Sequence, residues 1–353
     1  MKNKTYTWNT ASIVKETEDV VTIIFETNGH GFNYKPGQFV NLRQVVGEEA
    51  VSRSYSLSSS ADEDERPAIT IKKVEGGIMS NYVFHHAEEI KQWEVDGPHG
   101  SFFADPQLLN DKPIVLIGGG SGITPLYSIL KTFLKHSHAI IFLIDCNRTW
   151  NDVVFVKSLT YLEQVYADRL QVHHFLSREK EKNDFQGRNI KTEKLNKLVL
   201  KKTLKKLLAE MITEAEYFLC GPNGLIKLSK EALESLEIPA DKIHTEYFSP
   251  TDEENVVFEL PQTTKEVLIN YYDQTNLLEV QPGKTILETA LEDKIPLNYS
   301  CKNGTCGKCV AKQTAGKVHM AKNYALTEDE VNQGFVLLCQ SHPLNDEVII
   351  TIE

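Results

Sequence analysis

Four cysteines near the C-terminus have the spacing of iron–sulfur ligands. Three of them form the motif C-x4-C-x2-C, and the fourth follows after 29 further residues: Cys301, Cys306, Cys309 and Cys339. This is the ligand spacing of a plant-type [2Fe–2S] cluster. Gly304 and Gly307 lie between the cysteines, and glycine lets a tight loop bring its backbone amides close to the cluster sulfurs. Because such a cluster carries one electron at a time, the motif predicts electron transfer.

Zinc binding and disulfide bonds are the alternative interpretations of these cysteines. Structural zinc sites favour paired C-x2-C units, and the sequence has one such pair, Cys306 and Cys309. Disulfides are rare in the reducing cytoplasm, which is the expected location because the N-terminus lacks the apolar segment of a signal peptide. An iron–sulfur cluster therefore remains the favoured prediction.

Size and composition predict a globular protein of several domains. The chain has 353 residues, which suggests two or three domains, and 41% of them are hydrophobic. The net charge of −11 argues against nucleic acid, which requires a basic surface. The longest clear apolar run, Ala139–Ile144, is far shorter than the ~20 residues of a membrane span. We therefore expect a cytoplasmic protein with no membrane insertion and no nucleic-acid partner.

Residues 1–106 have the pattern of a small antiparallel β-barrel. Val20–Phe25 and Ala68–Val74 are rich in Val, Ile and Thr, and turns with Gly and Pro separate such runs. The string R-S-Y-S, residues 53–56, lies where a strand is expected to end. The string G-G-I-M-S, residues 76–80, lies at the expected start of a helix.

These two strings have the chemistry of a diphosphate site beside an aromatic ring. A guanidinium such as that of Arg53, facing the free N–H groups of a helix N-terminus, can hold a diphosphate. Tyr55 can lie flat on an aromatic ring system, and Ser56 can donate to a ring nitrogen. Either string alone would carry little weight, and it is their combination that predicts a nucleotide cofactor.

Residues 107–249 predict a doubly wound parallel sheet. Short apolar runs, which we expect to be strands, alternate with helical segments such as Leu126–Leu134. This alternation is typical of a doubly wound sheet. The predicted strands are Pro113–Ile117, Ala139–Ile144, Leu170–Leu176 and Tyr217–Leu219. Ligands of such sheets bind outside the carboxyl ends of the strands.

A glycine-rich turn after the first of these strands suits a dinucleotide. Gly120, Gly122 and Thr124 lie in the sequence G-G-G-S-G-I-T-P. Pro125 is expected at the first helical position, where its missing N–H has no cost. A second string opens a helix at the same edge of the sheet: Cys220, Gly221 and Pro222. Together they predict NAD(P)H binding.

Polar residues after the middle strands favour NADPH. Ser177 and Arg178 follow the strand that ends at Leu176, and a hydroxyl beside a guanidinium suits a 2′-phosphate. Asn147 and Arg148, after the preceding strand, add to this pocket. Asp145 permits the opposite interpretation, a ribose-binding carboxylate that favours NADH. We expect NADPH as the donor, with NADH as the alternative.

The order and spacing of R-S-Y-S and G-G-I-M-S resemble the FAD site of the ferredoxin–NADP reductase superfamily. This resemblance implies that Arg53 and the amides of Met79 and Ser80 hold the FAD diphosphate. It also implies that Tyr55 stacks on the isoalloxazine and that Ser56 reaches N5. Further residues are placed near the FAD by the same resemblance: Ser54, Ile71, Lys72 and Gly77.

The resemblance also implies which residues border the reacting rings. Cys220 and Glu246 would flank the point where nicotinamide meets flavin N5, and Phe248 would cover the second face of the flavin. Residues 265–353, after a linker at 250–264, resemble a plant-type ferredoxin domain with the β-grasp fold. Its ligand pattern would place Cys301 and Cys306 on one iron, and Cys309 and Cys339 on the other.

The chain as a whole is similar to the reductase subunits of phenylacetyl-CoA epoxidases and their relatives. The fold implied is a multi-domain α+β and α/β protein, with an antiparallel FAD-binding barrel, a doubly wound nicotinamide sheet and a β-grasp ferredoxin. The activity implied is hydride transfer from NADPH to FAD, then single-electron transfer through the [2Fe–2S] cluster to a terminal oxygenase or another acceptor protein. A desaturase, a hydroxylase or a hybrid-cluster protein is an alternative acceptor. A ferredoxin-only relay fed by another donor is the competing function, and the intact flavin and nicotinamide motifs argue against it.

Overall fold

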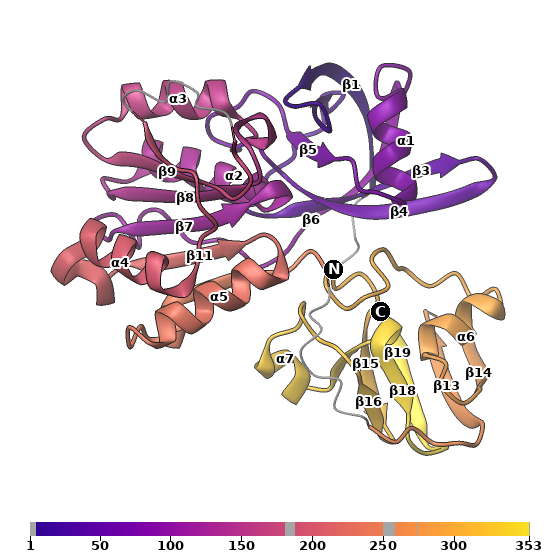
Figure 1. Ribbon diagram of the computed structural model, residues 1–353. Coiled ribbons are helices and arrows are strands. Elements are labelled where there is room, and N and C mark those ends of the chain that lie inside the picture. Colours follow the sequence, from indigo (N-terminus) through magenta and orange to yellow (C-terminus); the bar gives the residue numbers. More distant parts are fainter. Residues whose placement is uncertain (1–4, 181–187, 250–257, 273, 353) are drawn as a thin grey trace. The chain divides into compact units, whose positions relative to one another are not determined.

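The computed structural model describes residues 5–180, 188–249, 258–272 and 274–352 (Figure 1). Residues 250–257 of the expected linker lie outside this described part. Within it, no helix is long and apolar enough to cross a membrane. The chain forms two compact units, of which the larger contains residues 5–51 and 55–246 and the smaller contains residues 52–54 and the chain from residue 247 onward.

A curled antiparallel sheet forms the first half of the larger unit, apart from residues 52–54 of its strand β4 (Figure 1). Its strand order is β4-β3-β6-β1-β2-β5, and α1 (Ile78–His86) lies between β5 and β6 in the sequence. The interior is apolar because alternate residues of each strand point inward, and it includes fully buried Trp8, Ile23 and Trp93. The strands are β1 (Thr5–Lys15), β2 (Val20–Glu26), β3 (Phe39–Val46), β4 (Glu49–Ser56), β5 (Ala68–Lys72) and β6 (Gln92–His99).

A parallel sheet with helices on both faces forms the second half of this unit. Its strand order is β10-β9-β8-β7-β11-β12, so the chain starts in the middle and winds outward in both directions. The strands are β7 (Ile114–Gly119), β8 (Ile141–Asn147), β9 (Leu170–Leu176), β10 (Asn189–Lys191), β11 (Glu216–Cys220) and β12 (Ile243–Glu246). The helices are α2 (Ile123–His136), α3 (Val156–Val165), α4 (Lys197–Leu208) and α5 (Asn223–Glu234). The predicted doubly wound architecture is confirmed.

The alternation of side chains along β7 shows how two helical layers cover one sheet. Ile114 and Leu116 point into the core shared with α2 and α3, while Val115 and Ile117 point into the core shared with α4 and α5. Both faces are therefore apolar, as expected for a parallel sheet. α2 begins at Ile123, so Pro125 is its third residue and not its first as predicted. The N–H groups of the whole first turn lack intrahelical partners, so proline is tolerated there equally well.

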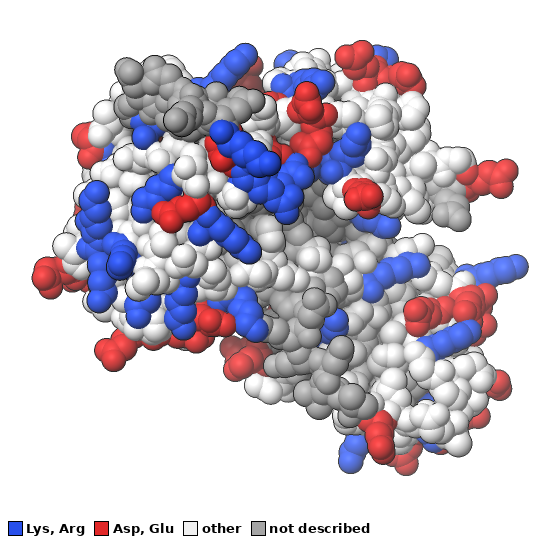
Figure 2. All heavy atoms as spheres, viewed as in Figure 1, with Lys and Arg blue, Asp and Glu red and all other residues white. Residues whose placement is uncertain are grey.

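The leucines and lysines of α4 lie on different faces of the helix. Leu200, Leu204 and Leu208 are fully buried in the core beneath the helix, while most of its lysines are exposed. This spacing of four residues places the leucines on one face of the helix. Figure 2 shows that Lys and Arg side chains on the face drawn are interspersed with Asp and Glu.

The smaller unit contains a mixed five-stranded sheet with one main helix against it. The strand order is β14-β13-β19-β15-β17, with β13 and β19 parallel, and β16 pairs separately with β18. α6 (Ile286–Glu292) contributes to the core beneath this sheet, in the arrangement expected for a β-grasp ferredoxin. The strands are β13 (Lys265–Tyr271), β14 (Gln274–Val280), β15 (Val310–Ala315), β16 (Val318–Met320), β17 (Phe335–Leu337), β18 (Ser341–Pro343) and β19 (Val348–Ile352), and a short helix α7 covers Glu328–Asn332.

Candidate functional site

The glycine-rich turn after β7 lies tightly against the ends of two neighbouring strands. A Cβ on Gly122 would lie 2.2 Å from the carbonyl oxygen of Cys220, and one on Gly119 would lie 2.3 Å from that of Cys146. Both contacts are with backbone, so only glycine fits at either position. A Cβ on Gly120 would meet nothing within 4 Å, and this residue has φ of +57°. The turn is therefore closed toward the sheet and open on its outer side, where a diphosphate can approach the backbone.

A chain of polar contacts supports this turn from the side of β8. The Gly120 N–H donates to Asn147 Oδ1 at 3.3 Å, and Asn147 Nδ2 donates to Asp145 Oδ2 at 2.8 Å. Asp145 Oδ2 also lies 3.1 Å from His174 Nδ1. Because Asp145 is 1% exposed and bonded to both neighbours, the structure contradicts the alternative interpretation of this residue as a ribose ligand. Asp145 instead orients the side chain that contacts the turn.

The residues predicted to form a 2′-phosphate pocket lie at one edge of the sheet. The Arg178 N–H donates to the carbonyl oxygen of Arg148 at 2.7 Å, and the Ser177 N–H donates to that of Asn147 at 3.0 Å. The side chains of Ser177 and Arg178 are exposed. Arg148 is also exposed, and its guanidinium forms an ion pair with Asp152. Arg178 is thus the more accessible cation for a phosphate.

The last two strands bring Cys220 and Glu246 together. β11 and β12 run parallel, with Cys220 paired to Glu246 in register. Cys220 is fully buried, and burial raises the pKa of its thiol. The residue Glu246 is half-buried, but its Oε2 is shielded from solvent and has no hydrogen-bond partner among the described residues. Desolvation raises the pKa of this carboxyl to about 8, which favours its protonated form at neutral pH.

The remaining residues predicted near the nicotinamide occupy different environments. Thr124 is buried, and its hydroxyl donates to the carbonyl oxygen of Ser121 at 2.9 Å, which closes the first turn of α2. A Cβ on Gly221 would lie 3.2 Å from the Gly119 nitrogen, so this strand end also approaches the turn closely. Pro222 is the N-cap of α5. Phe248 follows β12 and is 38% exposed.

On the flavin side, the string R-S-Y-S forms the end of β4. Alternation along the strand directs Arg53 and Tyr55 to one face and Ser54 and Ser56 to the other. Arg53 is exposed, and its Nη1 donates to the carbonyl oxygen of Ser52 at 2.7 Å. Tyr55 is half-buried and Ser56 is buried. An exposed guanidinium and a half-exposed ring on the same face have the chemistry needed for a diphosphate and an aromatic cofactor.

The helix α1 begins without a capping side chain. Gly77 is its N-cap, and the N–H groups of its first turn therefore have no side-chain acceptor. A Cβ on Gly77 would lie 2.6 Å from Ser80 Oγ, which accepts a hydrogen bond from the Val74 N–H at 3.2 Å. Met79 is 1% exposed with its side chain in the barrel core, so it can offer only its amide to a ligand. This helix end fits a phosphate group.

Two residues of β5 predicted to line the flavin differ in what they can offer. Ile71 is 1% exposed and belongs to the barrel core, so only its backbone can face a ligand. Lys72 Nζ lies 3.3 Å from Asp19 Oδ2, and Arg148 Nη2 lies 4.0 Å from the same oxygen. Asp19 therefore connects the barrel with the edge of the parallel sheet.

The cysteine loop of the smaller unit directs backbone amides at its own sulfurs. Cys306, Cys309 and Cys339 are buried and Cys301 is half-buried, and none forms a disulfide. The N–H groups of Cys301 and Cys339 donate to the sulfurs of Cys306 and Cys309, each at 3.5 Å. The Asn303 N–H donates to Cys301 Sγ at the same distance. Such donors stabilise thiolates and tune an iron–sulfur cluster.

The four thiols also interact with one another, since Cys301 contacts both Cys306 and Cys339, and Cys339 contacts Cys309. A hydrogen bond from Cys306 lowers the pKa of the Cys301 thiol, and one from Cys339 lowers the pKa of the Cys309 thiol. Among the described residues, no three Cys, His, Asp or Glu side chains form a site for a single metal ion. Four thiols gathered with backbone amide donors fit the ligand set of a two-iron cluster.

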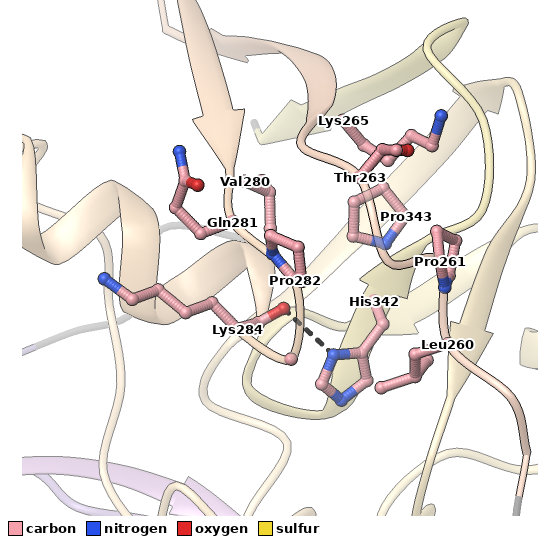
Figure 3. A pocket seen from close by; sticks show the side chains of 11 residues that line it. Leu260, Pro261, Thr263, Lys265, Val280, Gln281, Pro282, Lys284, His342 and Pro343 are labelled. Carbon is pink, nitrogen blue, oxygen red and sulfur yellow. Dashed lines mark hydrogen bonds between the residues drawn. The ribbon is translucent and has the colours of Figure 1, made fainter.

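A small pocket lies elsewhere in the smaller unit, next to β18 (Figure 3). Pro261, Pro282 and Pro343 contribute to its wall, and His342 Nδ1 lies 2.9 Å from the carbonyl oxygen of Lys284. None of the four cluster cysteines lines it. The pocket is therefore separate from the iron–sulfur site.

Sequence reasoning missed the residues that support the cofactor sites. Asn147 was predicted to add to the 2′-phosphate pocket, but its contact with the glycine turn was not foreseen, although an asparagine at the end of a buried strand beside such a turn is a usable signal. His174 was not singled out. A run of buried serines after β4, Ser58 to Ser60, was also missed. Its counterparts on α2 are Ser128 and Thr132, which are buried and one helical turn apart. Hydroxyls at this spacing on an otherwise apolar helix face could have indicated a polar contact.

Comparison with known protein families divides the chain into three successive domains. An oxidoreductase FAD-binding domain matches residues 9–103, and an oxidoreductase NAD-binding domain matches residues 116–231. A 2Fe-2S iron-sulfur cluster binding domain matches residues 269–344. The chain thus has the three predicted cofactor-binding domains, in the predicted order.

Two relatives match the chain over almost all of its length. The ferredoxin reductase component of 3-ketosteroid-9-alpha-monooxygenase from Mycobacterium tuberculosis is 31% identical, over 97% of this chain and 94% of that protein. One of the subunits of 1,2-phenylacetyl-CoA epoxidase from Escherichia coli is also 31% identical, over 97% of this chain and 96% of that protein.

A solved structure has the same succession of domains. Phthalate dioxygenase reductase, described as a modular structure for electron transfer from pyridine nucleotides to [2Fe–2S], aligns with a TM-score of 0.61 over 99% of this chain and 98% of that chain. The sequence identity is 19%, so this likeness concerns the fold alone. The predicted three-domain fold is confirmed.

Proposed function

Because the chain belongs to the family of oxygenase reductase components that combine FAD-binding, NAD-binding and [2Fe–2S] domains, we propose that it carries electrons from NADPH to a terminal oxygenase. The oxygenase of this proposal is of the phenylacetyl-CoA epoxidase type or a related one. A desaturase, hydroxylase or hybrid-cluster protein is the alternative acceptor. All six cysteines are free thiols, which supports action in the reducing cytoplasm.

The bound cofactors supply the redox chemistry, with a two-electron hydride step between NADPH and FAD and one-electron steps through the cluster. The protein supplies binding and alignment. Arg53 and the amides of Met79 and Ser80 bind the FAD diphosphate, while Tyr55 and Ser56 hold the ring. Ser54, the backbone of Ile71, Lys72 and Gly77 complete that site.

On the nicotinamide side, the backbone from Gly120 to Gly122 binds the NADPH diphosphate next to Thr124 and Gly221. Arg178, with Ser177 and Arg148, binds the 2′-phosphate and thereby selects NADPH over NADH. Pro222 starts the helix that follows the second turn. These assignments use groups that are exposed or lie at open helix and strand ends, as ligand binding requires.

The residues bordering the reacting rings exclude water and hold a proton. Cys220 is a neutral, buried thiol beside the protonated carboxyl of Glu246. This pair forms an uncharged wall, and Phe248 moves aside to admit the nicotinamide. In the smaller unit, Cys301 and Cys306 hold one iron, and Cys309 and Cys339 hold the other.

The observation that carries the proposal is the presence of all three sites in one chain. The first is the N-terminus of α1, which lacks a capping side chain and can bind the FAD diphosphate. The second is the glycine turn after β7, which is open on its outer side for the dinucleotide. The third is the group of four cysteine thiols, two of which accept hydrogen bonds from the backbone N–H groups of Cys301 and Cys339. A ferredoxin-only relay would need no intact nicotinamide site.

An anaerobic titration of the purified protein with NADPH, followed in the visible spectrum, tests the proposal. We expect the flavin and the iron–sulfur absorbance to bleach together. Bleaching of neither with NADPH or NADH would overturn it and favour the ferredoxin-only relay. Bleaching with NADH alone would overturn the NADPH preference and leave the rest intact.

A further inference from the structure

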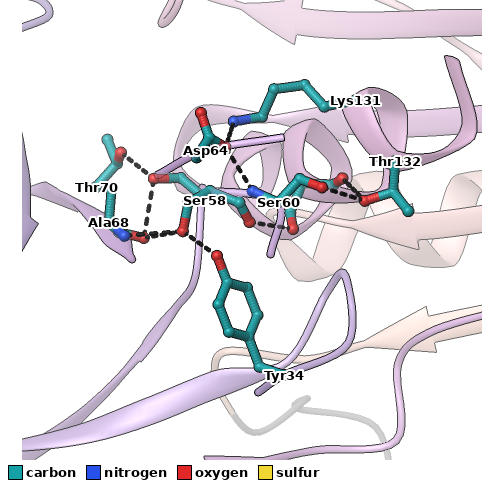
Figure 4. A network of polar contacts seen from close by, with 10 residues as sticks. Tyr34, Ser58, Ser60, Asp64, Ala68, Thr70, Lys131 and Thr132 are labelled. Atoms are coloured by element: carbon teal, nitrogen blue, oxygen red, sulfur yellow. Dashed lines mark hydrogen bonds and ion pairs between the residues drawn. The ribbon is translucent and has the colours of Figure 1, made fainter. Parts of the chain in front are cut away.

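A buried polar seam joins the barrel to the parallel sheet within the larger unit (Figure 4). We use the name "polar seam" for the contacts between the loop after β4 and the middle of α2. Its members are Ser59, Ser60 and Asp64 from the loop, and Ser128, Lys131 and Thr132 from α2.

Three contacts cross the seam directly. The hydroxyls of Ser60 and Thr132 are 2.8 Å apart, and Ser128 Oγ donates to the carbonyl oxygen of Ser59 at 2.6 Å. Lys131 forms an ion pair with Asp64, although its side chain is only 13% exposed. The three serines and the threonine are between 0 and 3% exposed. Because these hydrogen bonds are buried, water cannot replace them if they break. They therefore hold the barrel and α2 in one relative position.

The loop side of the seam is itself fixed to the barrel. The hydroxyls of Tyr34 and Ser59 are 2.6 Å apart, and Ser59 Oγ accepts from the Ala68 N–H at 2.8 Å. Asp64 Oδ2 accepts from the Ser60 N–H at 2.6 Å. The loop side of the seam therefore cannot shift without breaking a second hydrogen bond.

Both sides of the seam continue directly into the cofactor sites. Ser58 to Ser60 follow Tyr55 and Ser56, which end the flavin strand. On the other side, α2 begins at the glycine turn, and Ser128 and Thr132 lie one and two helical turns beyond Thr124. At 1.5 Å per residue these steps are about 6 and 12 Å. The seam is thus a short, rigid connection between the strand that holds the flavin and the helix that starts at the dinucleotide turn.

We propose that Ser60, Ser128 and Thr132, together with the Lys131–Asp64 pair, are positioning residues that set the approach of nicotinamide to flavin. This inference rests on the function proposed above. In that reaction a hydride leaves C4 of NADPH, which becomes NADP⁺, and the two electrons and the hydrogen are gained at flavin N5. The rate of such a step falls steeply when the reacting atoms move apart, so a looser seam slows it without changing how tightly either cofactor binds.

The test compares seam variants with a matched variant of the same helix. Thr132→Val removes the hydrogen bond to Ser60, and Ser128→Ala removes the one to the Ser59 carbonyl oxygen, while the Lys131–Asp64 ion pair remains in both variants. Ser137→Ala is the control. Ser137 is the C-cap of α2 and is also buried, but its Oγ donates to the carbonyl oxygen of Phe133 within the helix and not to the barrel. Thr132→Ser keeps the hydroxyl and serves as the conservative variant.

The first measured quantity is the rate of flavin reduction by saturating NADPH in an anaerobic stopped-flow experiment. The second is the intensity of the long-wavelength charge-transfer band between nicotinamide and flavin. We expect Thr132→Val and Ser128→Ala to lower the rate about tenfold and to weaken the charge-transfer band, with KM for NADPH unchanged. Ser137→Ala and Thr132→Ser should behave like the wild type.

Equal rates for the seam variants and Ser137→Ala would overturn the inference and leave the proposed function standing. Failure of the wild-type flavin to be reduced by NADPH or NADH would overturn both. If Thr132→Val does not fold, Ser60→Ala removes the same bond from the loop side and carries the test. In the double variant of Ser60 and Thr132, the loss of rate should not exceed that of either single variant, because one bond is lost in each case.

Discussion

The two units of this protein build their sites from different parts of the chain. In the smaller unit the proposed iron ligands are side chains, and three of the four come from a single loop of nine residues, 301–309. In the larger unit the proposed flavin and nicotinamide sites combine backbone atoms and side chains at the ends of strands and helices that are far apart in sequence. The cluster site thus depends on the identity of four residues, while the flavin and nicotinamide sites depend on topology. Single substitutions should therefore disable one unit and spare the other.

Replacement of a cluster cysteine should have the largest effect. We expect Cys306→Ser to abolish the iron–sulfur absorbance while NADPH oxidation with ferricyanide as acceptor stays close to that of the wild type, because one thiolate ligand is lost and the larger unit is untouched. Cys146→Ser is the matched control, since this thiol lies on β8 and outside the cysteine loop. Loss of both activities in Cys306→Ser would break the comparison between the units.

A methyl group in the dinucleotide turn should have the reverse effect. In Gly122→Ala the new Cβ would lie 2.2 Å from the Cys220 carbonyl oxygen, so the turn must shift. We expect NADPH-dependent flavin reduction to fall about 100-fold, with the cluster absorbance retained. Gly224→Ala is the control, because its Cβ would meet nothing within 4 Å. Equal rates for the two variants would show that the turn does not bind the dinucleotide.

Removal of the exposed arginine at the sheet edge should have a smaller effect that depends on the donor. Arg178→Ala should raise KM for NADPH about tenfold, since a charge-assisted bond to the 2′-phosphate is lost. KM for NADH should stay the same, which makes NADH the internal control. A parallel change for both donors would refute the assignment of Arg178.

The smallest predicted effect concerns the buried carboxyl at the end of β12. Burial raises the pKa of Glu246 from 4.5 to about 8, so the folded protein binds this proton more tightly than the unfolded chain does. The free energy of unfolding should therefore fall as the pH rises from about 4.5 to about 8. Glu246→Gln should reduce that slope, as measured by thermal unfolding of the cofactor-loaded protein at several pH values. The same slope in both proteins would show that the carboxyl is ionised in the folded state.

The comparison between the units also explains which features could be predicted from the sequence. The cysteine spacing led directly to a cluster, because a loop with three ligands imposes its own geometry. The sheet of the nicotinamide half was also predictable, since its apolar runs and glycine turn form local patterns. The position of Pro125 was wrong by two residues, because helix ends depend on hydrogen bonds that composition does not specify.

The role of Asp145 could not be predicted from the sequence. A carboxylate near the end of a strand is compatible with a ribose ligand, and its neighbours in sequence do not exclude that role. In the structure, Nδ1 of His174 on the adjacent strand lies 3.1 Å from Asp145 Oδ2, and Asp145 is buried. Contacts between neighbouring strands are long-range, so a single sequence does not reveal them.

The sequence by itself determined the types of cofactor and the order of the domains. Those features reside in side chains and glycines whose spacing is local and whose chemistry is distinctive. The tertiary structure alone decided which atoms support them: the polar seam between loop and helix, the pairing of Cys220 with Glu246, and the raised pKa of that carboxyl. These properties arise from burial and from contacts between distant segments, and both exist only once the chain has folded.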